Sequence, residues 1–208
     1  MSDEEIDRKI AVIFATDVVG YSKHMETDES ETVKALRACE KVLSGLFDKH
    51  KARLFNTGGD SFLAEFPSAV SAIECAVEFQ NSIKERNASD KATVKLEFRI
   101  GINSGDVIKE KGNLLGDGVN IAARLEALAQ TGGITISKGV YDFVKGKTNF
   151  EFNDLGIQKV KQNEFHAFDL LLKKSQRRKL KNKTSPKFAY LFAFVLLISS
   201  GFGFWLYS

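Results

Sequence analysis

Two aspartates have neighbours that suit a site for divalent cations. Asp17 follows an apolar run in residues 14–22 (FATDVVGYS), and Asp60 follows two glycines in residues 56–62 (NTGGDSF). Glycine tolerates positive φ and lets a ligand approach the backbone closely. Carboxylate oxygens are hard ligands that suit divalent cations, which in turn bind phosphate groups. The two segments therefore predict a metal site in which Asp17, at a strand end, and Asp60, at a hairpin turn, lie side by side.

A second group of polar residues is predicted on a helix. Asn120 and Arg124 are four positions apart in residues 112–126, whose second half has helical spacing of apolar residues. Residues at i and i+4 lie on the same face of a helix, so an amide and a guanidinium can act on one target. A solvated helix face is the ordinary interpretation of such a pair. The glycines that precede Asn120 favour a ligand instead.

The elements that must position these residues alternate between strands and helices. A continuous apolar run at residues 10–14 is typical of a strand buried on both faces. Helical spacing of apolar residues follows up to about His50, and a second helix begins at Pro67 and Ser68 and continues to about Arg86. Strands at residues 53–55 and 62–66 flank the turn that carries Asp60. Further elements are expected at residues 106–110, 134–136, near Tyr141, and at 150–160 and 165–172.

Strict alternation of apolar and polar residues at 94–102 predicts a half-buried strand. Alternate residues face opposite sides of a sheet, so Arg99 faces away from the core helices. The order strand, helix, hairpin, helix, strand predicts an α+β fold with a ferredoxin-like βαββαβ core and additional C-terminal α/β elements. Such a fold places its helices on one face of an antiparallel sheet. We expect the opposite face to be free and to collect the functional residues.

The C-terminal residues predict a membrane segment. Residues 188–207 contain no charged side chain, and about 20 apolar residues suffice to cross a bilayer. Tyr190, Trp205 and Tyr207 suit the two interfaces. Basic residues without an acid precede the segment and predict a cytoplasmic location for the preceding domain: Lys173, Lys174, Arg177, Arg178, Lys179, Lys181, Lys183 and Lys187. A hydrophobic core helix at the C-terminus is the alternative.

This pattern divides the chain into an N-terminal extension (1–9), a catalytic domain (10–172), a basic juxtamembrane linker (173–187) and a single transmembrane helix (188–207). Without the linker's eight basic residues, the chain has 22 basic and 27 acidic residues, so the catalytic part is acidic and is not expected to bind nucleic acid. The acidic N-terminus has no apolar stretch typical of a signal peptide. Cys39 and Cys75 are predicted to be reduced thiols that pack in the core.

Four motifs together resemble the class III nucleotidyl cyclases, the adenylate and guanylate cyclase catalytic domain. The resemblance covers roughly residues 10–172, in the family's order and approximate spacing. The matching motifs are residues 14–22 (FATDVVGYS), 59–60 (GD), 98–105 (FRIGINSG) and 116–124 (GDGVNIAAR).

The resemblance implies a role for each site residue. Asp17 and Asp60 would hold two Mg²⁺ or Mn²⁺ ions per active site, with the carbonyl of Val18 as a further ligand. Backbone amides of a turn that enters a helix can bind phosphate. The resemblance assigns that role to the amides of Val19, Gly20, Tyr21 and Ser22.

The remaining roles are assigned to side chains. Arg99 and Lys161 match the family's contacts to the triphosphate. Asn120 resembles the residue that orients the ribose, and Arg124 the residue that offsets charge on the α-phosphate. Asn56 and Asn113 occupy the base-reading positions. Adenylate cyclases have Lys and an Asp or Thr at these two positions, and guanylate cyclases have Glu and Cys.

The implied reaction converts a nucleoside triphosphate into a 3′,5′-cyclic nucleotide and pyrophosphate. The metal ions carry most of the chemistry, so no side-chain base is required. In the family the metal ligands come from one subunit and the Asn/Arg pair from the other, which implies a homodimer. An amide both donates and accepts hydrogen bonds, so Asn56 and Asn113 fit ATP or GTP. We expect ATP to be the substrate, since adenylate cyclases dominate the bacterial members of the family. We expect the protein to lie in the bacterial inner membrane.

Two other classes of function fit parts of the sequence. Residues 58–62 (GGDSF) nearly match the signature of diguanylate cyclases, which share a ferredoxin-like palm. That family has Asp or Glu where this chain has Ser61, and it has no counterpart of the helix with Asn120 and Arg124. A nucleotide-binding dimerisation module without catalytic activity, held at the membrane, is the second alternative. The two Asn residues at the base-reading positions motivate it.

Overall fold

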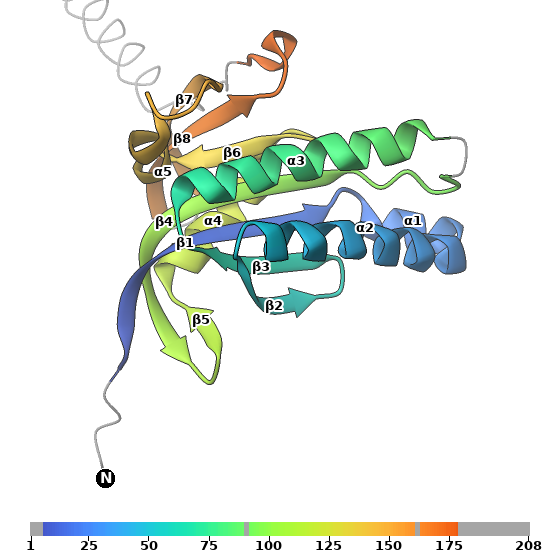
Figure 1. Cartoon of the computed structure of the whole chain (residues 1–208), viewed down its shortest axis with the longest axis horizontal. Helices are drawn as coiled ribbons and strands as arrows, with labels where there is room; N and C mark the ends of the chain where they lie inside the picture. The colour runs from blue at the N-terminus through green and yellow to red at the C-terminus, as the bar shows by residue number, and fades with distance from the viewer. Residues whose placement is uncertain (1–5, 90–91, 161–162, 179–208) are drawn as a thin grey trace, which may run out of the picture. The chain divides into compact units, whose positions relative to one another are not determined.

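Strand β1 (Arg8–Val18) lies in the middle of the sheet and pairs antiparallel with β3 (Ser61–Phe66) and β4 (Phe98–Glu110). A computed structural model of the chain describes residues 6–89, 92–160 and 163–178 (Figure 1). The sheet has the strand order β2-β3-β1-β4-β6-β8-β7, and β5 pairs with β4. The predicted α+β class and the βαββαβ order of the first half are therefore present.

Two helices of the first half begin at a side-chain cap. A short helix α1 (Tyr21–Thr27) follows β1, and α2 (Glu29–Lys49) begins where Asp28 accepts a hydrogen bond from the amide of Glu31. Helix α3 (Ala69–Ala88) begins in the same way at Ser68, as predicted. A side-chain oxygen at this position satisfies an amide that has no partner within the helix.

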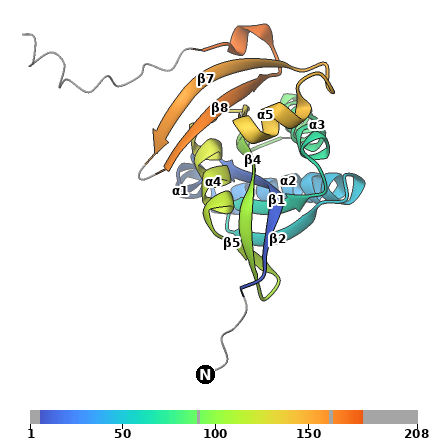
Figure 2. The same cartoon turned by 90° about the vertical axis from the view of Figure 1, so that its left-hand side faces the viewer.

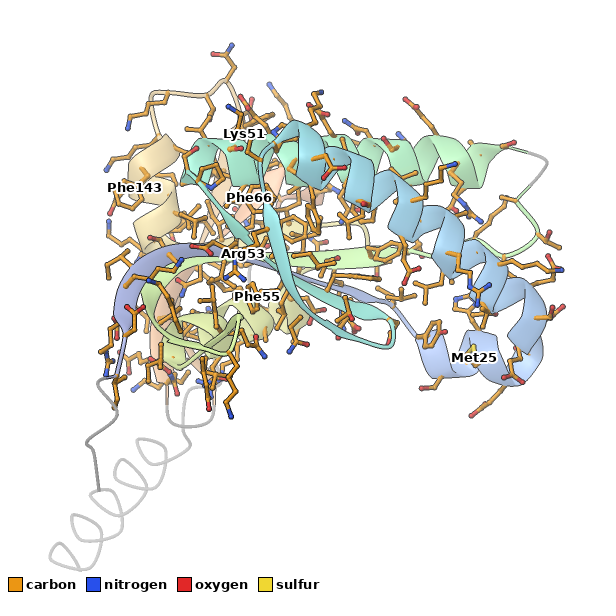
Figure 3. All side chains as sticks on the ribbon, turned by 60° about the horizontal axis from the view of Figure 1, so that its bottom comes forward. Met25, Lys51, Arg53, Phe55, Phe66 and Phe143 are labelled. Carbon is orange, nitrogen blue, oxygen red and sulfur yellow. The ribbon has the colours of Figure 1, made fainter. Side chains whose placement is uncertain are left out.

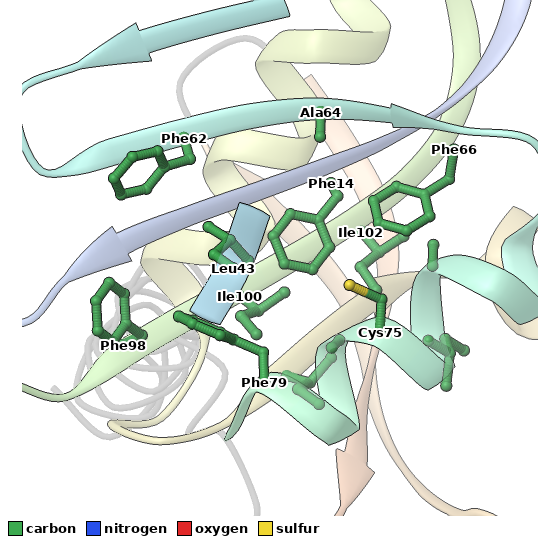
Figure 4. Packing of buried hydrophobic residues seen from close by; sticks show 14 of the residues in the cluster. Phe14, Leu43, Phe62, Ala64, Phe66, Cys75, Phe79, Phe98, Ile100 and Ile102 are labelled. Carbon is green, nitrogen blue, oxygen red and sulfur yellow. The ribbon is translucent and has the colours of Figure 1, made fainter. Parts of the chain in front are cut away.

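Phenylalanines fill the core between these helices and the sheet. Phe14 of β1 lies against Phe47 and Phe66, with ring centroids 5.7 and 5.5 Å apart. Phe79 of α3 meets Phe98 of β4 at 5.0 Å (Figure 4). The predicted core residues Leu96, Ile100 and Ile102 are also fully buried, while Arg99 faces the other side. The alternation at residues 94–102 thus predicts the faces correctly.

Strand β4 begins at Phe98 rather than at residue 94, and it continues through the second strand expected at residues 106–110. We expected residues 103–105 to interrupt it, but Ile13 pairs with Asn103 and Ala11 with Gly105 in an unbroken ladder with β1. The buried side-chain amide of Asn103 donates to the carbonyl of Gly118, 2.9 Å away. A distant hydrogen-bond acceptor therefore keeps a turn-forming residue inside a strand.

The expectation of a free sheet face is wrong for the central strands. Helix α4 (Asp117–Leu128) packs on β1 and β4 on the side opposite α3, as Figure 2 shows. A second core cluster fills this interface and includes Ala11, Ile13, Ala15, Val107, Leu114 and Ala122. Helix α4 fits there because the small residues Ala11 and Ala15 lie in the sheet beneath it.

The remaining strands and helices complete the sheet on both sides, with β2 at one edge and β7 at the other. They are β2 (Arg53–Gly58), β5 (Asn113–Leu115), β6 (Ile134–Ser137), α5 (Lys138–Val144), β7 (Glu151–Val160) and β8 (Asn163–Leu171), with the 3₁₀ helix η1 at Lys174–Gln176. Strand β6 runs parallel to β4 and antiparallel to β8.

The compact unit extends through Arg178. Residues 173–178, which we assigned to the juxtamembrane linker, fold with the domain because the guanidinium of Arg178 binds the buried carboxylate of Asp169 at 2.7 and 3.0 Å. The predicted membrane segment at 188–207 lies outside the described residues. Within the described ranges, no helix has the length and apolar character needed to cross a bilayer.

Both cysteines behave as predicted. Cys39 and Cys75 are buried free thiols in α2 and α3. The sulfur of Cys75 lies within the core cluster (Figure 4).

Candidate active site

Asp17 and Arg99 occupy directly paired positions at the ends of β1 and β4. Alternate residues of a strand face the same side of the sheet. The side chain of Asp17 therefore projects on the side of Ala11, Ile13 and Ala15, which is covered by α4. There a guanidinium nitrogen of Arg99, Nη2, donates to Oδ2 of Asp17 at 3.2 Å. Both side chains are 28% exposed, which leaves the pair accessible to a ligand.

Asp60 approaches the same carboxylate from the β2–β3 hairpin. Gly59 has a φ of 67°, and Gly58 pairs with Ser61 across the turn, so Asp60 lies at the tip as predicted. Burial raises the pKa of Asp17, and the negative charge of Asp60 and a hydrogen bond with its carboxyl raise it further, while Arg99 lowers it. The two predicted metal ligands are therefore neighbours whose charges repel each other.

Glu126 is a third carboxylate at this site, and the sequence patterns did not indicate it. It lies on the sheet side of α4, where its Oε1 is 2.9 Å from Nε of Arg99. Burial raises the pKa of Glu126 to about 7; Arg99 opposes that shift, and the charges of Asp17 and Asp60 add to it. The only signal in the sequence is a glutamate next to the apolar residue Leu125, which a surface position would explain equally well.

The turn after β1 offers fewer amides than predicted. The amide of Val19 donates to the carbonyl of Glu97 at 2.8 Å, so it is not available to a phosphate. Gly20 has a φ of 66° and precedes α1. The amides of Gly20, Tyr21 and Ser22 have no acceptor among the hydrogen bonds of the described residues. Unpaired amides are normal in a first helical turn and suit an anion.

Asn120 and Arg124 lie on another face of α4 from Glu126. The buried residues of the helix are Gly118, Ala122, Leu125 and Glu126, whereas Asn120 is exposed. Arg124 is not among the charges that shift the pKa of Asp17 or Glu126. Its Nη1 is buried, with no hydrogen-bond partner in the described part of the chain. One chain therefore does not bring Asn120 and Arg124 to the aspartates.

The two predicted base-reading residues lie on adjacent hairpins. Asn56 is exposed on β2, beside a bulge at Phe55, and Asn113 begins β5. Nη1 of Arg53 donates to the carbonyl of Gly112 at 2.6 Å and joins the two hairpins; Figure 3 labels Arg53 and Phe55 on β2. Oδ1 of Asn113 accepts from the amide of Leu114, which leaves its amide nitrogen as the free group.

Lys161 lies outside the described residues. Among those that are described, no group of three or more His, Cys, Asp and Glu side chains is arranged to hold a metal ion. Asp17 and Asp60 are two carboxylates, with the carbonyl of Val18 in the adjacent residue. Magnesium is commonly held by one or two carboxylates together with substrate phosphates, so this set fits a cation that arrives with a nucleotide.

The site combines acidic groups, one guanidinium and free amides at the open end of β1 and β4. Acidic oxygens suit cations, and the guanidinium and amides suit phosphate oxygens. In an α+β domain, this arrangement suits a site for nucleotide phosphates and divalent cations.

Comparison with known proteins identifies the family. The profile described as "Adenylate and Guanylate cyclase catalytic domain" matches residues 3–180. The chain belongs to this family, the class III nucleotidyl cyclases, whose members generally use divalent metal ions.

A curated relative and two solved structures support the assignment. The chain is 44% identical over 165 residues to "Putative adenylate cyclase 3" of Rhizobium meliloti (strain 1021). The aligned region covers 79% of this chain and 28% of that protein. It therefore spans little more than a quarter of that relative. The structure of "Adenylate/Guanylate Cyclase/Hydrolase from Silicibacter pomeroyi" is 32% identical with a TM-score of 0.74, covering 80% of this chain and 98% of that one. The structure of the adenylyl cyclase CyaB from P. aeruginosa is 24% identical with a TM-score of 0.71, and the match covers 85% of this chain and 100% of that chain. At this identity, the match supports only the assignment of the fold.

Proposed function

We propose that the chain is an adenylate cyclase that converts ATP into 3′,5′-cyclic AMP and pyrophosphate. The observation that carries the proposal is the meeting of Asp17, Asp60 and Arg99 at the open end of β1 and β4. The 44% identity to a protein named as an adenylate cyclase supports ATP as the substrate.

Each residue has a task that follows from its chemistry. Asp17, Asp60 and the carbonyl of Val18 would hold two Mg²⁺ or Mn²⁺ ions, which would activate the ribose 3′-hydroxyl and share the charge of the phosphates. Arg99 and the amides of Gly20, Tyr21 and Ser22 bind the β- and γ-phosphates. Lys161 is proposed for the same role.

The site is completed by a second copy of the chain. Asn120 and Arg124 face away from the aspartates of their own chain, and a buried guanidinium nitrogen of Arg124 has no partner among the described residues. A homodimer would place this pair over the nucleotide bound by the other subunit, where Asn120 orients the ribose and Arg124 offsets charge on the α-phosphate. Two equivalent sites result.

The base is read by Asn56 and Asn113. Because the side-chain oxygen of Asn113 accepts from the backbone amide of Leu114, its amide nitrogen can donate to adenine N1 or to guanine O6. This observation keeps guanylate cyclase as the second candidate function. A catalytically weak nucleotide-binding dimerisation module is the third, and the intact carboxylate and guanidinium groups disfavour it.

We further propose that residues 188–207 anchor the protein as a single-pass helix in a bacterial inner membrane, with the cyclase domain in the cytoplasm. Alkaline extraction of membranes tests the anchor. The intact chain should stay with the membrane, and a chain ending at residue 187 should be released.

One assay tests the activity. The purified full chain is incubated with Mn²⁺ and either ATP or GTP, and the products are separated by mass. We expect cyclic AMP from the wild type and none from Asp17→Asn. Cyclic GMP alone would establish the guanylate alternative, a cyclic dinucleotide would establish the diguanylate alternative, and no product would exclude a cyclase.

A further inference from the structure

Glu126 is held against β4 by an unusually close approach of α4. A Cβ atom on Gly101 would lie 2.2 Å from both the carbonyl oxygen of Ala122 and the amide nitrogen of Glu126. No side chain fits there, so the helix backbone rests directly on the strand. Because Arg99 and Gly101 share one face of β4, this packing brings the carboxylate of Glu126 beside the guanidinium.

The two carboxylates occupy the same edge of the guanidinium of Arg99. Glu126 lies at Nε and Asp17 at Nη2, and these nitrogens share one side of the planar group. In the described part of the chain, Nη1 of Arg99 has neither a hydrogen bond nor an ion pair. The guanidinium therefore presents its other end to a ligand.

Glu126 does not have the features of a residue placed for stability. Its side chain is only 12% exposed, and two further carboxylates lie near it. Burying a charge next to like charges is unfavourable, and a glutamine of the same shape would pack without that penalty. The ion pair with Arg99 explains why a negative charge is present at this position.

We propose that Glu126 is the positioning residue for Arg99 and orients Nη1 toward the β- and γ-phosphates of the nucleotide. The proposal rests on the proposed function, in which Asp17 is a metal ligand. Once Asp17 binds a cation, it no longer restrains Arg99, and Glu126 is the remaining carboxylate that does. The Nε of Arg99 and the Oε1 of Glu126 are buried and 2.9 Å apart without the alignment of a hydrogen bond, so Glu126 holds the guanidinium through an ion pair.

The test compares nucleotides that differ in their phosphates and cannot react. 3′-Deoxy-ATP and 3′-deoxy-GTP lack the attacking hydroxyl, so calorimetry with Mg²⁺ reports binding without turnover, and the matching 3′-deoxy monophosphates lack the groups that Arg99 addresses. Glu126→Gln should weaken triphosphate binding about tenfold and leave monophosphate binding within about twofold. The KM for the natural triphosphate should rise in parallel.

A double-mutant cycle shows whether Glu126 acts through Arg99. In an Arg99→Ala background, Glu126→Gln should cause no further loss of triphosphate affinity. Glu78→Gln is the matched control, because Glu78 pairs with Lys49 on the outer helices. This substitution should change the affinity for neither the triphosphate nor the monophosphate. If Glu126→Gln does not fold, Glu126→Asp keeps the charge one methylene further away and should show the same pattern with a smaller loss.

The outcomes separate this proposal from the proposed function. Equal weakening of triphosphate and monophosphate, no weakening, additivity with Arg99→Ala, or a wild type that binds no nucleotide would each overturn the role of Glu126. A wild type that binds triphosphate and shows the expected pattern, yet forms no cyclic product, would overturn the cyclase and leave the role of Glu126 standing.

Discussion

Asp17 and Arg99 are cross-strand neighbours whose side chains meet at 3.2 Å, while the same guanidinium lies 2.9 Å from Glu126. A lysine at position 99 would keep the charge but has no planar group that reaches two carboxylates and a phosphate together. We therefore predict that Arg99→Lys lowers kcat/KM at least about tenfold, a loss of roughly 1.4 kcal/mol in transition-state stabilisation. Steady-state kinetics with Mn²⁺ and ATP measure this. Lys41→Arg on the exposed side of α2 should leave kcat/KM unchanged.

Replacing Asp17, one of two carboxylates that repel each other, should affect stability and cation binding in opposite directions. Burial and the charge of Asp60 both raise the pKa of Asp17, so Asp17→Asn removes an unfavourable charge from the metal-free protein. We expect the Tm of the metal-free variant to equal or exceed that of the wild type, as is common when a functional site is neutralised.

Cation binding should change in the opposite direction. Mn²⁺ with 3′-deoxy-ATP should raise the Tm of the wild type and not that of Asp17→Asn, as measured by differential scanning calorimetry. An equal rise in both proteins would show that Asp17 is not a ligand.

Local patterns in the sequence predict the site only where local structure builds it. The hairpin with Asp60 depends on Gly58 and Gly59 beside it, and the direction of Arg99 follows from strand alternation, so both were predictable. Glu126 was not, because its burial depends on Gly101, which is distant in sequence.

The same limit applies to the backbone. The amide of Val19 is engaged by the carbonyl of Glu97, and the side chain of Asn103 by the carbonyl of Gly118. Neither partner is visible until the strands are paired. Long-range hydrogen bonds of this kind determine which groups are free to bind a ligand. Turn and alternation patterns predict only the element and the face on which a residue lies.

The two cysteines should be unreactive in the folded protein. Burial raises the pKa of Cys39 to about 11 and that of Cys75 to about 12, and only the thiolate is nucleophilic. With an aromatic disulfide reagent at pH 8, we expect no reaction in the native state and two thiols per chain in denaturant. Fast labelling of the native protein would contradict the packing of α2 and α3 on the sheet.

Arg178 should be essential for the stability of the domain. It donates to Asp169 through two nitrogens and to the carbonyl of Leu128 at the end of α4, and Asp169 also accepts from Thr135. Arg178→Ala leaves a buried carboxylate uncompensated, so we expect a loss of about 3–5 kcal/mol in the free energy of unfolding, measured by urea titration.

A matched pair of variants isolates this contact. Arg177→Ala changes the exposed neighbour and should have little effect, and Asp169→Asn in the Arg178→Ala background should recover part of the loss. For the same reason, a chain cut after Leu172 should be less stable than one that retains Arg178. Equal stability of the two would show that the ion pair contributes nothing.

Glu65 should make stability depend on pH in the acid range. Burial alone would raise the pKa of Glu65, but hydrogen bonds from Lys9 and Arg53 outweigh it and lower the pKa from its ordinary value of 4.5. Because the folded state holds the proton less tightly, this stabilisation is fully present above pH 4.5 and is lost as the pH falls through the lower folded-state pKa. Glu65→Gln should therefore cost about 1 kcal/mol near pH 7 and progressively less toward pH 3. Glu164→Gln removes the exposed pair with Lys159 and should cost little at any pH. If the cost of Glu65→Gln stayed constant down to pH 3, the carboxylate would not be the stabilising form, and the ion pairs that join β1, β2 and β3 would not explain the effect.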